Sequence, residues 1–246
     1  MKHHGRVCMY KLFSVLALFV LSCVCYAQTE LHLNTTGQPP LNTPAMTGFM
    51  DQVTSEAFRR VGLSLRTSRL PAERGLKNAN SGLTDGEMSR IAGLQKIYPN
   101  LIRVPESIMD WHFCAFSPQQ INLNNSWQSL KPYQVAFING WKILEKNVPV
   151  NSSTIKVKNV DQLFYLLKTS RADLIMYERW GGLLKIKQLK MNRVSLQLPP
   201  LATRHMYIYL HRKHKNYIKK IAESLKEMKR DGSYDRISEK ILMPLM

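Results

Sequence analysis

Cysteine is scarce in this chain, and its placement excludes a disulfide framework. Of the four cysteines, Cys8, Cys23 and Cys25 lie within the first 27 residues, so only Cys114 follows that segment. A single cysteine forms no internal disulfide and no cysteine-based metal site. Stability must therefore come from a packed core, and the roughly 220 remaining residues are enough for one large domain or two small lobes.

Familiar catalytic motifs are also missing. The chain has no Ser-His-Asp order of a known hydrolase, no HExxH zinc motif and no glycine-rich phosphate loop. The chain therefore lacks the commonest sequence signatures of hydrolases, metalloproteases and nucleotide-binding enzymes. We expect no cofactor and no metal ion.

Acidic residues are few compared with basic ones. There are 17 Asp and Glu against 35 Lys and Arg, a formal net charge of +18, and such a field attracts anions and anionic surfaces. The densest basic run, residues 211–220 (HRKHKNYIKK), suits an anionic partner, a membrane surface or the solvated face of a helix. Ile218, Ile221, Leu225 and Met228 recur at helical spacing and favour the solvated face. Because no nucleic-acid recognition motif is present, we expect no nucleic-acid partner.

The N-terminal segment has the features of a secretory signal. Basic residues (Lys2, Arg6 and Lys11) precede an almost wholly apolar run at 12–24, and Cys25-Tyr26-Ala27 places small residues where a signal peptidase cleaves. We predict a signal peptide at residues 1–27, a mature start at Gln28 and a periplasmic location. A membrane anchor is the alternative, but the run is shorter than the roughly 20 residues of a spanning helix. Lipidation of Cys23 is a second, weaker alternative.

A short unit occurs twice along the chain. LKNANSGLTDGE ends at Glu87 and LKTSRADLIMYE ends at Glu178. Each indicates a helix end, a tight break and a short strand that carries an aspartate, Asp85 or Asp173, with the glutamate beyond it. Two such strand ends in two similar lobes predict a cleft that binds a small polar molecule. The two aspartates themselves are more typical of turn-closing residues that bond to backbone.

The order of the elements predicts an α/β fold. Strands at 31–35, 63–67 and 83–85 alternate with helices at about 50–61 and 72–79, which implies a parallel sheet with crossover helices. A second set follows, with strands at 133–139, 154–158 and 172–177 and helices at 142–146, about 159–167 and 183–190. Asn159 with Gln162 forms a capping-box pattern before the middle helix. Helices at 216–228 and 234–242 end the chain.

We therefore predict two lobes joined by a hinge of two crossing segments, at 111–117 and 205–210. Residues 28–112 form the N-terminal part of lobe 1, residues 113–202 form lobe 2, and residues 203–246 return and pack their helices on lobe 1. The predicted fold class is α/β, with two lobes that each contain a parallel or mixed sheet.

This arrangement resembles the extracellular solute-binding proteins of family 3, the periplasmic receptors of amino-acid ABC importers. The tail, ESLKEMKRDGSYDRI at 223–237, is similar to that family's closing helix, Lys-x-Asp-Gly-x-Tyr turn and last helix. The start at 31–35, Pro39-Pro40, and Gly48-Phe49 before a helix also match, as does SRAD with Glu178. The resemblance implies a periplasmic-binding-protein-like fold. It also implies a monomeric receptor with a small-molecule ligand and an ABC permease or a membrane sensor as its partner.

Arg90 is the first candidate for the ligand site. It follows a strand, where open α/β sheets bind ligands, and its guanidinium can hold a carboxylate through two hydrogen bonds. An ion pair with Glu87, three residues before it, is the alternative. The resemblance places Glu178 where the family has an ammonium-binding aspartate, so Glu178 would accept an ammonium or hydroxyl group. Its alternative is a helix-start carboxylate stabilised by the helix dipole.

Four further residues complete the predicted site. Arg74 is placed to reach the cleft from the start of a helix, with a solvated position as the alternative. Gly140 lies where a strand meets a helix, so its backbone N–H group is a candidate anion donor. Trp141 and Trp111 are candidates for apolar ligand contacts, although a tryptophan is more often part of the core. Besides the binding protein, two interpretations stay open. One is an enzyme on the same fold, a dehydratase in which Glu178 is the general acid. The other is a binding module that acts through its basic surface, with a vestigial cleft.

Overall fold

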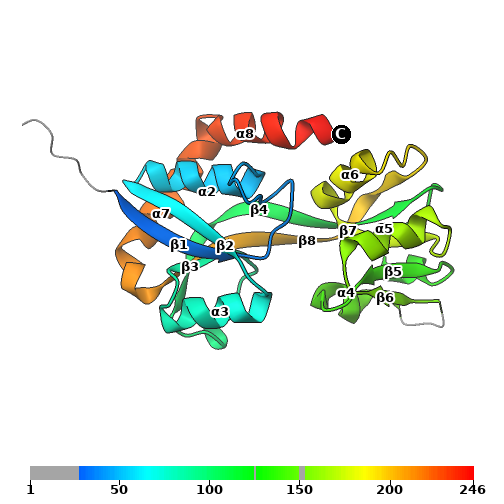
Figure 1. The fold of residues 1–246 in the computed structure, drawn as a ribbon, viewed down its shortest axis with the longest axis horizontal. Coiled ribbons are helices and arrows are strands. Elements are labelled where there is room, and N and C mark those ends of the chain that lie inside the picture. The colour runs from blue at the N-terminus through cyan, green and yellow to red at the C-terminus, as the bar shows by residue number, and fades with distance from the viewer. Residues whose placement is uncertain (1–27, 125, 150–152) are drawn as a thin grey trace, which may run out of the picture.

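The computed structural model describes residues 28–124, 126–149 and 153–246 and contains one eight-stranded mixed sheet. Its strand order is β2-β1-β3-β8-β4-β7-β5-β6, and the sheet runs through both lobes (Figure 1). This confirms the predicted α/β fold. The predicted signal peptide, its cleavage position and Cys23 lie outside the described residues.

Lobe 1 has the predicted β-α-β-α-β order. Its elements are β1 (Thr29–Thr35), α2 (Phe49–Arg59), β2 (Leu63–Arg69), α3 (Ala72–Ser81) and β3 (Gly86–Arg90). β1 lies between β2 and β3 and is parallel to both. The helical periodicity of α2 buries Met50, Val53 and Ala57 completely against the sheet.

One predicted strand is displaced in the structure. Residues 83–85 do not form the third strand, which begins at Gly86. The backbone N–H groups of Leu83 and Thr84 instead donate to the Asn78 carbonyl and close the end of α3. Gly82, with φ 81°, supplies the left-handed turn that this helix end requires.

Both aspartates of the repeated unit lie at the start of a strand, not at its end. The Asp85 carboxylate accepts from the His32 N–H at 2.8 Å, and the Asp85 N–H donates to the His32 carbonyl at 2.8 Å. Asp173 makes the same pair of bonds with Gln134, at 2.7 and 2.9 Å. We call each arrangement an aspartate clasp. The predicted bonding of the aspartates to backbone is confirmed, but their partner is the neighbouring strand.

Lobe 2 repeats the pattern. Its elements are β5 (Val135–Ile138), α4 (Lys142–Asn147), β6 (Ile155–Val157), α5 (Val160–Lys168), β7 (Leu174–Glu178) and α6 (Arg179–Gln188). β5 is parallel to both β6 and β7. The predicted cap is present, because the Asn159 side chain accepts from the Gln162 N–H at 2.9 Å.

Two long antiparallel strands, β4 (Leu101–Ser117) and β8 (Ser195–His211), run from one lobe into the other. They contain the two predicted crossing segments. The predicted boundaries between the lobes, 112/113 and 202/203, lie opposite each other in this ladder, where His112 pairs with Thr203 and Phe113 pairs with Ala202. The division of the chain at these positions stays a prediction.

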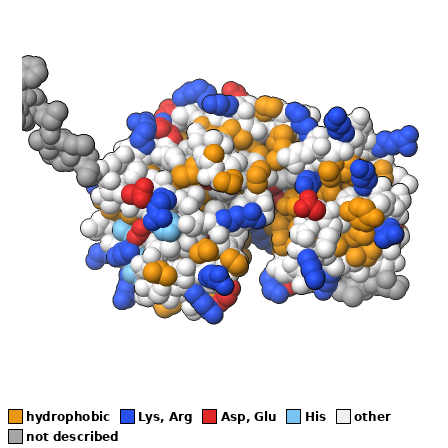
Figure 2. Space-filling model, viewed as in Figure 1, with side chains coloured by type: hydrophobic (Ala, Val, Ile, Leu, Met, Phe, Trp, Pro, Cys, Tyr) orange, Lys and Arg blue, Asp and Glu red, His pale blue; other side chains and the backbone are white. Residues whose placement is uncertain are grey.

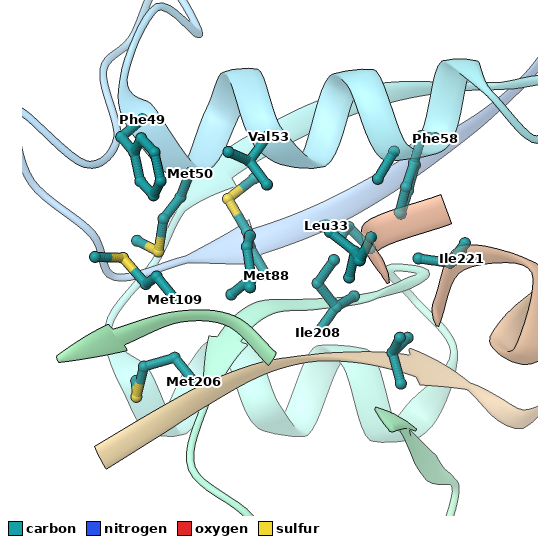
Figure 3. Packing of buried hydrophobic residues seen from close by; sticks show 14 of the residues in the cluster. Leu33, Phe49, Met50, Val53, Phe58, Met88, Met109, Met206, Ile208 and Ile221 are labelled. Carbon is teal, nitrogen blue, oxygen red and sulfur yellow. The ribbon is translucent and has the colours of Figure 1, made fainter. Parts of the chain in front are cut away.

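The chain ends with α7 (Lys215–Arg230), α8 (Ser233–Ile241) and a short turn, η4 (Met243–Leu245). α7 packs on lobe 1, where the Ser224 hydroxyl donates to the Ala57 carbonyl of α2 at 3.0 Å. Figure 3 shows part of the core that α7 shares with α2: Met50 and Val53 project from α2 toward Met88, and Ile221 of α7 lies at the other end of the same cluster. Trp180 of α6 belongs to the same cluster, and Lys187 of α6 donates to the Pro244 carbonyl at 3.0 Å. The tail therefore contacts lobe 2 as well as lobe 1.

Candidate functional site

A small cavity of about 50 Å³ lies between the lobes, at the carboxyl ends of β1 and β7. Figure 2 shows the molecule hollowed between its two lobes. Lobe 1 lines the cavity with the loop after β1, and lobe 2 and the hinge line it mainly with aromatic and acidic side chains: Thr36, Gly37, Gln38, Pro39, Leu41, Trp111, Trp141, Tyr177, Glu178 and Gly181. The carboxyl ends of strands are where open α/β sheets bind ligands. A larger open groove of about 640 Å³ lies between α2 and α8 and not at the carboxyl ends of strands.

Aromatic rings form one wall of the cavity. The Trp141 and Tyr177 rings stack with 5.0 Å between centroids and 21° between planes, and the Trp111 ring lies 6.2 Å from that of Trp141. Phe113 meets Trp141 edge to face at 5.8 Å. The Trp111 Nε1 atom is buried and has no hydrogen-bond partner among the described residues. A buried donor of this kind is available to a ligand.

Glu178 ends β7 and caps α6 with its side chain. Its Oε1 accepts from the Trp180 N–H at 3.0 Å, and its Oε2 accepts from the Gly181 N–H at 2.8 Å. The residue is only 3% exposed. Burial raises the pKa of Glu178 to about 7, against the opposing effect of the two backbone donors. The Glu178 carboxyl therefore has the role that the sequence analysis gave as the alternative, a carboxylate at the start of a helix. Its binding of a ligand stays a prediction.

Arg90 forms the ion pair with Glu87. Its Nη2 and Nε atoms lie 2.6 and 2.7 Å from the same carboxylate oxygen, Oε2, and Nη2 is also 3.4 Å from the Ala72 carbonyl oxygen. Glu87 is fully buried, and this burial raises its pKa while Arg90 lowers it. The positive charge of Arg90 is therefore already compensated within lobe 1. Its Nη1 group makes no hydrogen bond with a described residue, but Arg90 is not among the residues that line the cavity, so its contact with a ligand stays a prediction.

The other two predicted residues are arranged differently. Arg74 is exposed on the first turn of α3 and makes no ion pair with a described residue. The Gly140 N–H donates to Glu145 Oε1 at 2.8 Å. An anion at this position would have to displace that carboxylate. A ligand-binding role for Arg74 and Gly140 stays a prediction.

Sequence reasoning missed Tyr177 and the residues of the loop after β1. Tyr177 is buried and packs on Trp141, a contact between segments 36 positions apart that no local pattern indicates. The loop is held by Asp51, whose carboxylate accepts from the Asn42 side chain at 2.5 Å, the Thr43 N–H at 2.8 Å and the Gly48 N–H at 3.1 Å. Burial raises the pKa of Asp51, and these three donors lower it.

Solved structures share this fold at low sequence identity. An ancestral arginine-binding protein bound to glutamine is 20% identical with a TM-score of 0.67, covering 86% of this chain and 97% of its own. The GluR0 ligand-binding core in complex with L-glutamate is 14% identical with a TM-score of 0.74, covering 88% of this chain and 99% of its own. A histidine kinase sensor domain with similarity to periplasmic binding proteins is 13% identical with a TM-score of 0.66, covering 88% and 96%. The predicted resemblance to solute-binding proteins is confirmed in the fold.

Sequence comparisons add one relative. No family model matches the chain. An uncharacterized protein of Shewanella oneidensis is 25% identical over 194 residues, which cover 75% of this chain and 72% of that protein. Within the described residues, no helix combines the length and apolar character needed to cross a membrane. In the same residues, no group of three or more His, Cys, Asp or Glu side chains is arranged to hold a metal ion.

Proposed function

We propose that this chain is an exported solute-binding protein that captures a small, amino-acid-like ligand between its two lobes. The observation that carries the proposal is the cavity at the carboxyl ends of β1 and β7, which both lobes line. The amino-acid ligands named for two of the similar structures support the same ligand class. Capture between lobes closes them by a hinge motion, for which β4 and β8 provide the hinge.

A carboxylate on the ligand would bind on the lobe 1 side. The free Nη1 group of Arg90 would donate to it, and Arg74 would add positive charge from α3. The buried Nε1 group of Trp111 is a further donor, and the Trp141 ring would pack on apolar parts of the ligand. On the lobe 2 side, Glu178 would accept an ammonium or hydroxyl group.

The partner in this proposal is a membrane protein that recognises the closed form. An ABC permease would take the ligand from the lobes, whereas a membrane sensor would respond to closure. The proposal also includes cleavage before Gln28 and a monomer in the periplasm. Intact-mass measurement of the exported protein tests the processing, because a mass that retains residues 1–27 or carries a lipid on Cys23 would contradict it.

Titration calorimetry on Arg90 variants tests the ligand site, once a thermal-shift screen of amino acids and related carboxylates has identified a ligand. Loss of a charge-assisted partner typically costs about 1.5 to 3 kcal/mol, so Arg90→Ala should weaken binding about 10- to 100-fold. Arg90→Lys should recover only part of this, because a single ammonium cannot keep the Glu87 contacts of Nε and Nη2 and also donate to a ligand from the position of Nη1. Glu87→Gln should strengthen binding, because it removes the charge that now compensates Arg90.

The matched control is Arg66→Ala, which removes an exposed arginine of β2 that is paired with Glu30 of β1. It should leave the affinity unchanged. Wild-type affinity in Arg90→Ala, with a melting curve that shows a folded protein, would remove Arg90 from the site. Unchanged affinity in Glu87→Gln would show that the ion pair does not limit ligand binding.

One observation favours a second candidate, an enzyme with Glu178 as general acid. A carboxyl with a pKa of about 7 holds a proton near neutral pH, as general acid catalysis requires. Its two oxygens, however, are both engaged by backbone donors of α6. Incubation of each identified ligand with the protein, followed by chromatography, should show no product. Turnover that disappears in Glu178→Gln would establish the enzyme instead.

A further inference from the structure

The end of lobe 1 far from the cleft carries an unbalanced group of cations. Arg212 and Lys213 lie in the short turn η3 (Arg212–His214), and Lys215, Lys219 and Lys220 follow in the first turns of α7. We call these five residues the basic end. Lys213 pairs with Asp85 at 2.8 Å, and the other four make no ion pair with a described residue. Figure 2 shows Lys, Arg and His side chains gathered at this end of the molecule.

The helix itself disfavours these charges. The predicted solvated face of α7 is present, since its opposite face buries Ile221, Leu225 and Met228. A solvated face explains why these side chains are exposed, but it does not explain why all of their charges are positive. The first turn of α7 contains no acidic residue, and cations at a helix N-terminus oppose the helix dipole. Burial and the neighbouring cations also lower the pKa of His211. Because these charges repel one another within the fold, an external anion would stabilise them.

Exposed apolar side chains lie beside the basic end. Leu83 is 74% exposed and Ile97 is 72% exposed. The carbonyl of Gly82, next to Leu83, accepts from Lys213 Nζ at 3.1 Å. The Arg212 N–H donates to the Asn100 carbonyl at 2.8 Å, three residues after Ile97. The same surface therefore offers both cations and apolar side chains, a combination typical of proteins that lie on a membrane.

The first strand begins at this end too. His214 Nε2 lies 2.6 Å from Asp85 Oδ1, and Asp85 clasps the backbone of His32. β1 starts three residues earlier, at Thr29, so its start is roughly 10 Å from His32 at the rise of a strand. Figure 1 places this start at the end of lobe 1 away from lobe 2. A mature chain that starts at Gln28 would therefore begin at the same end of the molecule as these cations.

We propose that the basic end is a docking surface for a bilayer of anionic phospholipids. Its cations lie against the phosphate groups, and Leu83 and Ile97 enter the interface between headgroups and acyl chains. The molecule then stands on the tip of lobe 1, and the cavity between the lobes stays open to solvent. A soluble polyanion would use the cations alone, so the apolar pair favours the bilayer.

Vesicle sedimentation with the exported protein tests this surface. We expect binding to vesicles of equal parts phosphatidylcholine and phosphatidylglycerol, but not to phosphatidylcholine alone, and weaker binding as salt is raised. Each cation near an anionic bilayer is worth roughly a fivefold change in partition. The variant Arg212→Gln/Lys219→Gln/Lys220→Gln should therefore bind on the order of 100-fold more weakly. Its melting temperature should be unchanged or higher, because cations leave the helix N-terminus.

The matched control removes the same charge from exposed positions of lobe 2, as Lys168→Gln/Arg171→Gln/Lys190→Gln. It should bind like the wild type, and an equal loss in both triple variants would show that only net charge matters and overturn the proposal. Leu83→Ser should weaken vesicle binding even at high salt. If Leu83→Ser has no effect and soluble polyphosphate binds as tightly as vesicles, the surface is a polyanion site and the bilayer proposal is wrong.

Discussion

Replacing Glu178 by glutamine should remove a large part of the pH dependence of stability. The folded-state pKa is about 7, against 4.5 for a free glutamate, a difference of roughly 2.5 units. At 1.36 kcal/mol per unit, this corresponds to about 3 kcal/mol. Because the folded-state pKa is raised, the folded protein holds the proton more tightly than the unfolded chain. This stabilisation is full below about pH 4.5 and is lost as the pH rises through about 7.

Urea unfolding of both proteins across this pH range measures the effect. The wild-type unfolding free energy minus that of Glu178→Gln should fall by about 3 kcal/mol from pH 4.5 to pH 8. Asp51 and Glu87 also have raised pKa values, but they are present in both proteins and cancel in the difference. Asn159→Ala, which removes no titratable group, should give a curve parallel to the wild type. A parallel curve for Glu178→Gln would show that Glu178 stays ionised, and the reasoning from burial would be refuted.

Three further substitutions test the packing around the site. Arg90→Ala leaves the buried Glu87 carboxylate unpaired and should lower the unfolding free energy by about 3 to 5 kcal/mol. Adding Glu87→Gln to Arg90→Ala should restore part of the lost unfolding free energy. If urea unfolding shows that the double variant is no more stable than Arg90→Ala, the ion-pair account is wrong. Gly182→Ala places a Cβ 2.1 Å from the Phe116 ring and should lower the unfolding free energy by about 1 to 3 kcal/mol through overpacking. An unchanged melting temperature would contradict this and show that the ring moves aside. Asn159→Ala removes the cap of α5 and should cost about 1 kcal/mol in the same melting experiment.

Periodic and capping patterns predicted most of the fold. The helical spacing in α2 and α7 marked their buried faces, and the Asn159 cap was visible because its partner lies three residues away. β3 was placed too early, since Leu83 and Thr84 have the composition of a strand but bond back to α3. Its true residues, Gly86–Arg90, contain a buried ion pair that hides the apolar pattern of a central strand.

The candidate site was less predictable than the fold. Trp111, Trp141 and Glu178 do line the cavity between the lobes, but their neighbour Tyr177 carried no signal of its own. The partners of Arg90 and Glu178 depend on burial and on side-chain direction, which residue spacing does not specify. Spacing did allow the Arg90 ion pair as an alternative. Only the folded arrangement shows that Glu178 accepts two backbone donors.

The predicted boundaries, if correct, would make lobe 2 an insertion into lobe 1. Phe113 and Ala202 are paired across the ladder between β4 and β8, so the chain would leave lobe 1 and re-enter it at points about 5 Å apart. A short hairpin turn in place of the residues between them would therefore reconnect lobe 1 without moving its strands. The main loss would be Trp180, which completes the lobe 1 core from α6. Exchange of lobe 2 would thus be limited by the contacts of α6, Trp180 in the lobe 1 core and Lys187 on the tail, more than by the continuity of the chain.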